Sequence, residues 1–565
     1  MASMDKGESE PLVRRDAGKS GIADALRETA RLLQSGDNDA ALAILYPALY
    51  EEPLNSGAFL FFSDLCIFSK RWDLLDEICH LRLKEMPDEA ETLCRQAQAR
   101  LGLGRYLEAA RILEGVAAGS PLNGVAWHEL GRVQKRLAMP DEALVSFKKA
   151  VESDPGNMVF QDSSLFAMLF SDTVSPEEIA VAHRSWGEKF AFPVLGRKSA
   201  VHGGKITVGY LSPDFREHSV SSFIRPVIVN HDRERFRVIC YHCGPEKDRT
   251  TMQFSEMAEF WRDITDMSDA DAYSLIADDN VDILVELAGH TAWNRLQLMA
   301  MRPAGINVSW IGYPHSTGLS GIDFRLTDAM ADPPGLSEPL STERLARLPG
   351  CFLCYSPPVD SPLPSFAPPM LENGFVTFGS FNNPGKITPK ILGCWRALLK
   401  AVPESRLMLK GEAFDDPEAC SDMLERFSLP EERVITAGWT PDRRSHLALY
   451  NHVDIALDTW PYNGTTTTCE ALWMGVPVIT LAGSHHASRV GATLLSAAGL
   501  GMFICKSAEE YLRKGIELSG NPGLLEWSRR NLRKMVSASP LMDGAGFTLE
   551  LEKLYDSLVS GCSCR

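Results

Sequence analysis

The sequence predicts an α-helical superhelix of short repeats followed by two α/β, Rossmann-like domains. Three observations lead to this prediction. Pro53, Pro87, Pro121 and Pro155 lie 34 residues apart, a spacing typical of helix-turn-helix repeats. Beyond the repeats, short β-branched runs alternate with amphipathic stretches, and a proline-rich segment at 356–374 divides this alternation into two halves. A chain of 565 residues also exceeds what one hydrophobic core usually serves.

The clearest repeat is WHELGRVQKRLAMPDEALVSFKKAVESDP at 127–155, and it resembles the tetratricopeptide pattern. The small residues Gly131 and Ala143 allow its two helices to approach closely. The copy before it also fits the pattern, whereas the two earlier copies are degenerate. We therefore predict about four tetratricopeptide-like repeats over 22–155, after a disordered N-terminus at 1–21.

Stacked repeats form a curved groove, which is a surface suited to peptides or partner proteins. The alternative is that the repeats are a helical spacer that fixes the following domains or makes a dimer. Both roles stay open at this point, as does the oligomeric state.

A helical connector is expected at 156–204, because SPEEIAVAHRSWGEKFA has the pattern of a helix. The first Rossmann-like domain then covers 205–365, with strand runs such as KITVGYLS and VDILVELAG. The second covers 366–565, with runs such as FVTFGSF and VDIALDTW, and includes the C-terminal helices. Runs of this kind are typical of parallel sheets covered by helices. Ligands bind beyond the carboxyl ends of such strands, so the residues after each run are candidates for a site.

Four threonines follow one of these strands in WPYNGTTTTCEALWMG, where Asn463 and Gly464 turn the chain and a helical pattern begins. Thr465, Thr466 and Thr467 would therefore stand at a helix N-terminus, where free N–H groups and the positive end of the helix dipole bind anions. The alternative is that one threonine simply caps the helix. Since capping needs a single hydroxyl, the sequence favours an anion site.

Polar side chains follow three other predicted strands. FNNPGK places Asn383 and Lys386 after FVTFGSF, and a lysine ammonium is a common phosphate partner, although most loop lysines are only solvated. In the first domain His218 follows KITVGYLS, while His290 and Thr291 follow VDILVELAG. Histidines at such positions can bind sugar hydroxyls or move protons, but most histidines do neither.

Composition argues against several classes of function. A formal net charge of −17 argues against a surface that wraps nucleic acid, and no apolar run is long enough to cross a membrane. The polar N-terminal segment lacks the apolar core of a secretion signal, so we expect a cytoplasmic protein. The sequence has no GxxxxGK[ST] loop, HExxH motif or Cys/His metal spacing, so neither a metal site nor a bound cofactor is predicted.

Several longer motifs occur together: DFREH, GYPHSTG, FNNPGK, LDTWPYNGTTTT and GSHHASRVGATLL. With the repeats and the two Rossmann-like halves, they resemble the O-linked N-acetylglucosamine transferase and SPINDLY-type family over nearly the whole chain, and the short repeat array resembles that of a bacterial member. The resemblance implies a GT-B fold and an inverting glycosyltransferase that works without a metal. It also implies transfer of N-acetylglucosamine from UDP-GlcNAc, the donor substrate, to Ser/Thr hydroxyls of proteins or peptides that bind through the repeat groove.

The resemblance also implies roles for residues of the second domain. The diphosphate would contact the three threonines, and Lys386 would offset the charge that grows on the diphosphate; Asn383 belongs to the same motif as Lys386. Glu470 matches an acidic position that binds the ribose, where an aspartate is usual. His446 matches a residue that packs against uracil, and Arg443 or Asp442 stands where the family has a lysine.

On the first domain, the resemblance makes His218 a positioning group or general base beside the reacting centre. It also makes Gly312, Tyr313 and Pro314 part of the sugar pocket, where the Gly312 N–H would reach an acetamido carbonyl. His290 and Thr291 are candidates for the same pocket. By contrast, His485 and His486 fall outside the matching positions and are expected to be structural.

The shared motifs leave other functions open. A SPINDLY-like enzyme would transfer fucose from GDP-fucose to protein hydroxyls, and a related cytoplasmic transferase would glucosylate asparagine. A third alternative is a scaffold whose transferase half is inactive and whose repeats do the binding; the intact Lys386, His218 and threonine cluster argue against it.

Overall fold

The computed structural model describes residues 21–190 and 204–563, and contacts between residues divide this part of the chain into two compact units, the first ending at Val133 and the second beginning at Gln134. The disordered terminus expected at 1–21 lies outside the described residues, apart from Gly21. Within the described ranges, no helix is both long and apolar enough to cross a bilayer.

The first unit is a run of helices in which α1 to α6 each pack against the next, as the repeat pattern predicts. Its core contains side chains such as Leu42, Phe62 and Ile78. The clearest sequence repeat corresponds to α7 and α8, so the prediction of helical repeats is confirmed. The helices are α1 (Ile22–Gln34), α2 (Asn38–Glu51), α3 (Ser56–Phe68), α4 (Trp72–Glu85), α5 (Ala90–Gly102) and α6 (Tyr106–Gly119), and they are followed by α7 (Gly124–Arg136), whose last residues, from Gln134 on, belong to the second unit.

Three helices lead from the repeats to the sheets: α8 (Pro140–Ser153), α9 (Met158–Met168) and α10 (Pro176–Lys189). Ser175 and Glu178 form a capping box at the start of α10. Phe147 of α8 and Trp186 of α10 share one hydrophobic core with residues of the first sheet. The second helix of the clearest repeat therefore packs with the second unit, whereas the sequence analysis placed it in a repeat domain that runs to residue 155.

The first sheet has seven parallel strands in the order β3-β2-β1-β4-β5-β6-β7. The β1 run is almost continuously apolar and buried, because helices cover a parallel sheet. Its elements are β1 (Ile206–Ser212), α11 (Ser221–Asn230), β2 (Phe236–His242), α12 (Arg249–Met257), β3 (Phe260–Asp263), α13 (Asp269–Asp278), β4 (Ile283–Glu286), α14 (Leu296–Ala300), β5 (Ile306–Ser309), β6 (Phe324–Asp328) and β7 (Arg344–Leu348).

The second sheet has six parallel strands in the order β10-β9-β8-β11-β12-β13. Thr388 caps α16, and Pro389 stands in its first turn, where the missing N–H costs nothing. The elements are α15 (Met370–Asn373), β8 (Thr377–Ser380), α16 (Pro389–Ala401), β9 (Arg406–Lys410), α17 (Pro417–Phe427), β10 (Val434–Ala437), α18 (Arg443–Ala448), β11 (Ile455–Leu457), α19 (Thr466–Trp473), β12 (Val478–Leu481), α20 (Val490–Ala497), β13 (Ile504–Cys505), α21 (Ala508–Ser519) and α22 (Pro522–Ser537). The prediction of two Rossmann-like domains is confirmed.

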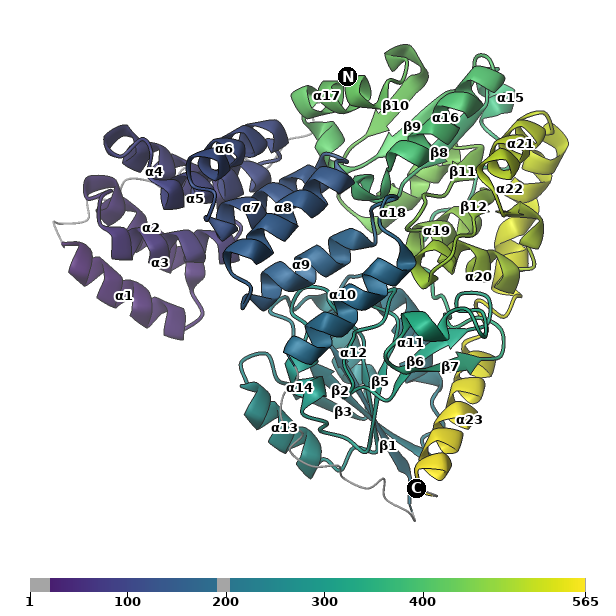
Figure 1. Ribbon diagram of the computed structural model, residues 1–565, viewed down its shortest axis with the longest axis horizontal. Coiled ribbons are helices and arrows are strands. Elements are labelled where there is room, and N and C mark those ends of the chain that lie inside the picture. Colours follow the sequence, from purple (N-terminus) through teal and green to yellow (C-terminus); the bar gives the residue numbers. More distant parts are fainter. Residues whose placement is uncertain (1–20, 191–203, 564–565) are drawn as a thin grey trace. The chain divides into compact units, whose positions relative to one another are not determined.

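The last helix, α23 (Gly544–Ser563), returns to the first sheet, where it packs against α11 and β7 (Figure 1). A buried polar chain fixes it there. The Nδ1 of His231 lies 2.9 Å from a carboxylate oxygen of Glu552, and the same oxygen accepts the N–H of Asp232. The hydroxyl of Tyr210 lies 2.7 Å from Nε2 of His231.

We expect Glu552→Ala to lower the free energy of unfolding by about 3 kcal/mol, because it leaves the buried ring of His231 and the N–H of Asp232 without their acceptor. Urea unfolding followed by circular dichroism measures this change. Glu550→Ala, a substitution of an exposed glutamate on the same helix, is the control and should have little effect. Equal stability of the two variants would contradict a role for Glu552 in docking α23.

Candidate functional site

A cavity of about 540 Å³ lies within the second unit, and loops at the carboxyl ends of strands from both sheets line it. In each sheet the strand order reverses at one point, between β1 and β4 in the first and between β8 and β11 in the second. The loops after these four strands supply His218, Thr291, Lys386 and Thr466 to the cavity. Doubly wound sheets bind ligands at such reversal points, so this cavity is the candidate site.

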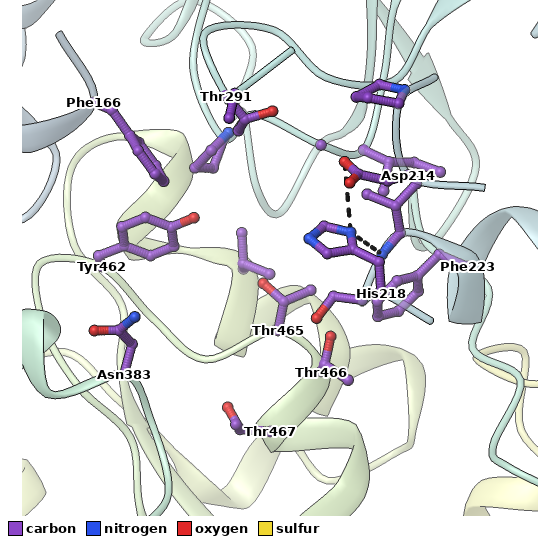
Figure 2. A pocket seen from close by; sticks show the side chains of 18 of the residues that line it. Phe166, Asp214, His218, Phe223, Thr291, Asn383, Tyr462, Thr465, Thr466 and Thr467 are labelled. Atoms are coloured by element: carbon purple, nitrogen blue, oxygen red, sulfur yellow. Dashed lines mark hydrogen bonds and ion pairs between the residues drawn. The ribbon is translucent and has the colours of Figure 1, made fainter. Parts of the chain in front are cut away.

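The three threonines form one wall of the cavity, at the N-terminus of α19 (Figure 2). Thr465 is the N-cap residue, yet its side chain makes no capping hydrogen bond. The hydroxyls of Thr465 and Thr466 have no hydrogen-bond partner within the described chain, whereas the Thr467 hydroxyl donates to Oδ1 of Asn382 at 2.7 Å. Two hydroxyls and the free N–H groups of the first turn therefore face the cavity, as an anion site requires.

Lys386 is half-buried and lines the same cavity as these threonines. Its Nζ donates to the carbonyl of Asn463 at 2.9 Å and lies 3.8 Å from the centre of the Tyr462 ring. Burial lowers the pKa of Lys386 to about 8, and the nearby Asp458 opposes that shift. Asp458 also accepts the N–H of Gly464, so one buried carboxylate links the lysine to the turn before the threonines. Asn383, whose Oδ1 accepts the N–H of Gly385, lines the same part of the cavity.

His218 faces the same space from the first sheet (Figure 2). Its Nδ1 accepts the backbone N–H of Val220 at 3.3 Å, and Oδ2 of Asp214 lies 3.6 Å from Nδ1. Burial lowers the pKa of His218, although Asp214 opposes the shift. Because Nδ1 is the acceptor, the neutral ring carries its proton on Nε2, which makes His218 a hydrogen-bond donor toward a ligand.

Five of the expected residues do not line the cavity: His290 and Tyr313, and the group of Arg443, His446 and Glu470 described below. Both ring nitrogens of His290 are engaged, Nδ1 with Asp162 and Nε2 with the carbonyl of Thr317, each at 2.8 Å. The ring of Tyr313 is buried, and its hydroxyl lies 2.7 Å from Nε2 of His183. These side chains instead join α9 and α10 to the first sheet. A position after a strand fixes the backbone there but does not fix which way the side chain turns.

Gly312 and Pro314 line the cavity as expected, and Thr291 does so too. A Cβ at Gly312 would lie 1.9 Å from the carbonyl oxygen of Leu287, so the close approach of two chain segments requires glycine here. The N–H of Gly312, however, already donates to the carbonyl of Trp310 at 2.9 Å. The N–H that was expected to meet an acetamido carbonyl is therefore occupied.

Glu470, His446 and Arg443 form a second group, one helical turn from the threonines on α19 and on the facing α18. The carboxylate oxygens of Glu470 lie 3.0 Å from Nε2 of His446 and 3.4 Å from the guanidinium of Arg443. Burial alone would raise the pKa of Glu470, but His446 and Arg443 bring it below its usual range. The rings of Phe381 and Tyr450 lie beside His446 and provide an aromatic surface next to the charged group.

Other lining residues were missed by the sequence analysis. Tyr462 lies beneath the Lys386 ammonium, and its place directly after a strand was a usable signal. Phe166 and Phe170 of the connector region reach the cavity, and Lys135 of α7 lies over both rings. The pattern of an amphipathic helix does not show which surface the helix packs against, so the sequence could not identify these three residues as part of a site. His486, expected to be structural, also lines the cavity.

No group of three or more side chains suited to hold a metal ion occurs among the described residues. The lining of the cavity includes two lysines, two histidines and the hydroxyls of several threonines. This set can bind an anionic group and a polyhydroxylated one next to it.

Comparison with known proteins shows the same organisation. The model of glycosyl transferase family 41 matches residues 174–356 and 363–551, which is most of the chain. The chain belongs to glycosyl transferase family 41. A tetratricopeptide repeat model also matches residues 125–157, which is the clearest repeat of the sequence.

Curated relatives in this family carry the name "Probable UDP-N-acetylglucosamine--peptide N-acetylglucosaminyltransferase SPINDLY". The one from Solanum lycopersicum is 42% identical over 421 residues, which cover 72% of this chain and 44% of the relative. The one from Arabidopsis thaliana is 40% identical over 420 residues, which cover 72% and 45%. This family 41 chain therefore spans less than half the length of these relatives.

A solved structure matches nearly the whole chain. An O-GlcNAc transferase mutant from Thermobaculum terrenum is 30% identical, covers 96% of this chain and 98% of its own, and has a TM-score of 0.81. The repeats and both Rossmann-like halves of this family 41 chain thus match one solved architecture, which confirms the predicted fold.

Proposed function

We propose that this family 41 chain transfers N-acetylglucosamine from UDP-GlcNAc to Ser/Thr hydroxyls of proteins, with inversion and without a metal ion. The observation that carries the proposal is that Lys386 lines one cavity with the unpartnered hydroxyls of Thr465 and Thr466 at the N-terminus of α19. His218, from the first sheet, lines the same cavity. Such a site suits the diphosphate of a nucleotide sugar.

The residues of the cavity and of the neighbouring Glu470 group then have separate roles. The acceptor hydroxyl attacks the anomeric carbon as its bond to the diphosphate breaks, with the hydroxyl proton passing to water or a phosphate oxygen. The electron pair of the broken bond stays on UDP, so negative charge grows beside Lys386 and the threonines, which stabilise it. His218 donates from Nε2 toward the reacting groups. Glu470 and His446 hold the ribose and base.

The protein acceptor is proposed to bind through the repeats of the first unit, because stacked helical repeats provide extended binding surfaces. The 42%-identical relative from Solanum lycopersicum carries a peptide transferase name, which supports a polypeptide acceptor. A cytoplasmic location, expected from the sequence, remains a prediction.

One observation favours a second donor. The N–H of Gly312 is occupied by the carbonyl of Trp310, so the expected contact to an acetamido group needs a local rearrangement. A sugar without that group, such as fucose carried by GDP-fucose, needs none. Calorimetric titration with UDP and with GDP separates the two: tighter binding of UDP supports N-acetylglucosamine transfer, and tighter binding of GDP supports fucose transfer.

The decisive test is transfer of radiolabelled N-acetylglucosamine from UDP-GlcNAc to proteins of a cell lysate. Labelling should persist in EDTA, because side chains and helix N–H groups rather than Mg²⁺ are proposed to hold the diphosphate. Labelling that disappears in EDTA and returns with Mg²⁺ or Mn²⁺ would contradict the metal-independent mechanism. The Lys386→Ala variant is the negative control for labelling by other proteins.

UDP affinity should fall as the pH rises above about 8, the value to which burial lowers the pKa of Lys386. The bound diphosphate favours the ammonium form and raises this pKa, so binding is strongest below the free value and weakens as the pH rises from the free value toward the raised one. Between the two pKa values, binding takes up a proton. Calorimetry at pH 8.5 in buffers of different ionisation enthalpy measures the uptake, and Lys386→Met should abolish it. The same uptake in both proteins would assign the proton to another group.

A further inference from the structure

His486 is a histidine of the second domain that reaches the cavity from the loop after β12. It is only 5% exposed, and its Nδ1 lies 2.7 Å from Oδ2 of Asp332, which belongs to the first domain. The contact therefore joins the two Rossmann-like domains beside the cavity.

The surroundings of Asp332 decide the protonation of the ring. Asp332 is buried and accepts hydrogen bonds from Arg325 and from the hydroxyl of Thr327. Burial alone would raise the pKa of Asp332, but Arg325 and His486 hold it well below its usual range. Asp332 is thus a carboxylate and can only accept, so Nδ1 of His486 is the donor and carries the ring proton.

The other nitrogen, Nε2, has no hydrogen-bond partner within the described chain. In the neutral ring Nε2 bears a lone pair and can only accept. His218 shows the reverse arrangement, since its Nδ1 accepts from Val220 and its Nε2 donates. The cavity therefore presents one histidine acceptor and one histidine donor to a ligand.

The position of His486 indicates which part of a ligand it meets. The carbonyl of the next residue, Ala487, accepts the N–H of Asn463, whose own carbonyl holds Lys386. His486 thus lies beside the turn at Asn463 and Gly464, which leads to the threonines at the N-terminus of α19. The ring of Phe352 packs edge-on against it at 4.9 Å, and Val490 lines the cavity near it. An acceptor among apolar side chains next to a diphosphate site suits a sugar ring, which has apolar C–H faces and O–H donors at its edge.

We propose that His486, oriented by Asp332, is a specificity-determining residue that accepts a hydrogen bond from a hydroxyl of the donor's sugar. The inference rests on the proposed function, because it requires a nucleotide sugar in this cavity. It gives a specific role to a residue that no other step of the reaction uses.

The test compares UDP-GlcNAc with its 3-deoxy, 4-deoxy and 6-deoxy analogues as donors for the full-length chain. The wild type should use one analogue about 10–100-fold less efficiently in kcat/KM, because a buried acceptor built for a hydroxyl is left unpaired. His486→Leu should use UDP-GlcNAc and that analogue about equally well. His486→Gln, which keeps an acceptor oxygen, should retain part of the discrimination and covers the case in which the leucine variant misfolds.

Two measurements keep the alternatives apart. UDP affinity should be unchanged in His486→Leu; a loss of UDP affinity equal to the loss of UDP-GlcNAc affinity would overturn the inference, because the histidine would then bind phosphate. Unchanged discrimination in both variants would overturn it as well. His485→Gln, a change at the neighbouring histidine that does not line the cavity, should discriminate as the wild type does. If the wild type neither binds UDP nor transfers the sugar, the proposed function fails, whatever the histidine does.

Discussion

Replacing Lys386 with alanine is expected to lower turnover by about 10²–10³-fold, while UDP affinity changes much less. The diphosphate gains charge as the bond to the sugar breaks, so a cation held beside it contributes more in the transition state than in the bound ground state. The ammonium is already fixed by the carbonyl of Asn463 and by the ring of Tyr462, so little reorganisation is needed as charge develops.

The measurement is kcat at saturating UDP-GlcNAc, together with UDP affinity from calorimetry. Lys390→Ala is the matched control, because this exposed lysine, four residues after Lys386, bonds to the carbonyl of Asp172 and does not line the cavity. It should keep near-normal turnover. Near-normal turnover in Lys386→Ala would remove Lys386 from the reaction, whereas equal losses in turnover and UDP affinity would make it only a binding residue.

The fold was predictable because its signals are local. The strand runs beginning at Lys205 and Phe375 are short, apolar and followed by helix patterns, and both became strands of parallel sheets. The docking of α23 on the first sheet was not predictable, because it depends on His231 and Glu552, which are far apart in sequence. The same is true of α8, whose repeat pattern resembles that of other copies although its Phe147 packs in the core of the second unit.

The candidate site was predictable where the position of a residue after a strand is enough to place it at the cavity. Lys386, His218 and the threonines follow strands at the two reversal points, and all of them line the cavity. The rule failed for His290 because its side chain turns toward Asp162 of α9, a contact that depends on long-range packing. The sequence predicts a structural role for His486, because it falls outside the matching family positions; its orientation depends on a carboxylate from the other domain, Asp332.

The second large effect is expected for His218→Ala, which should lower turnover by about 10²-fold with little change in UDP affinity. The reason is the hydrogen-bond pattern of the ring. Since Nδ1 accepts from the N–H of Val220, the neutral histidine presents Nε2–H to the cavity and acts there as a donor.

The activity of His218→Gln distinguishes a hydrogen-bond donor from a general base. Glutamine keeps an N–H donor of similar reach but cannot take a proton at neutral pH, so it should recover about tenfold of the activity lost in the alanine variant if His218 is a donor. If glutamine is as inactive as alanine while both variants stay folded and bind UDP, the donor role is wrong and His218 is the base. Single-turnover rates decide between them, because they isolate the chemical step from product release. Val220→Pro would remove the N–H that fixes the tautomer, but α11 begins at Ser221, so the glutamine variant, which leaves the backbone untouched, is the cleaner experiment.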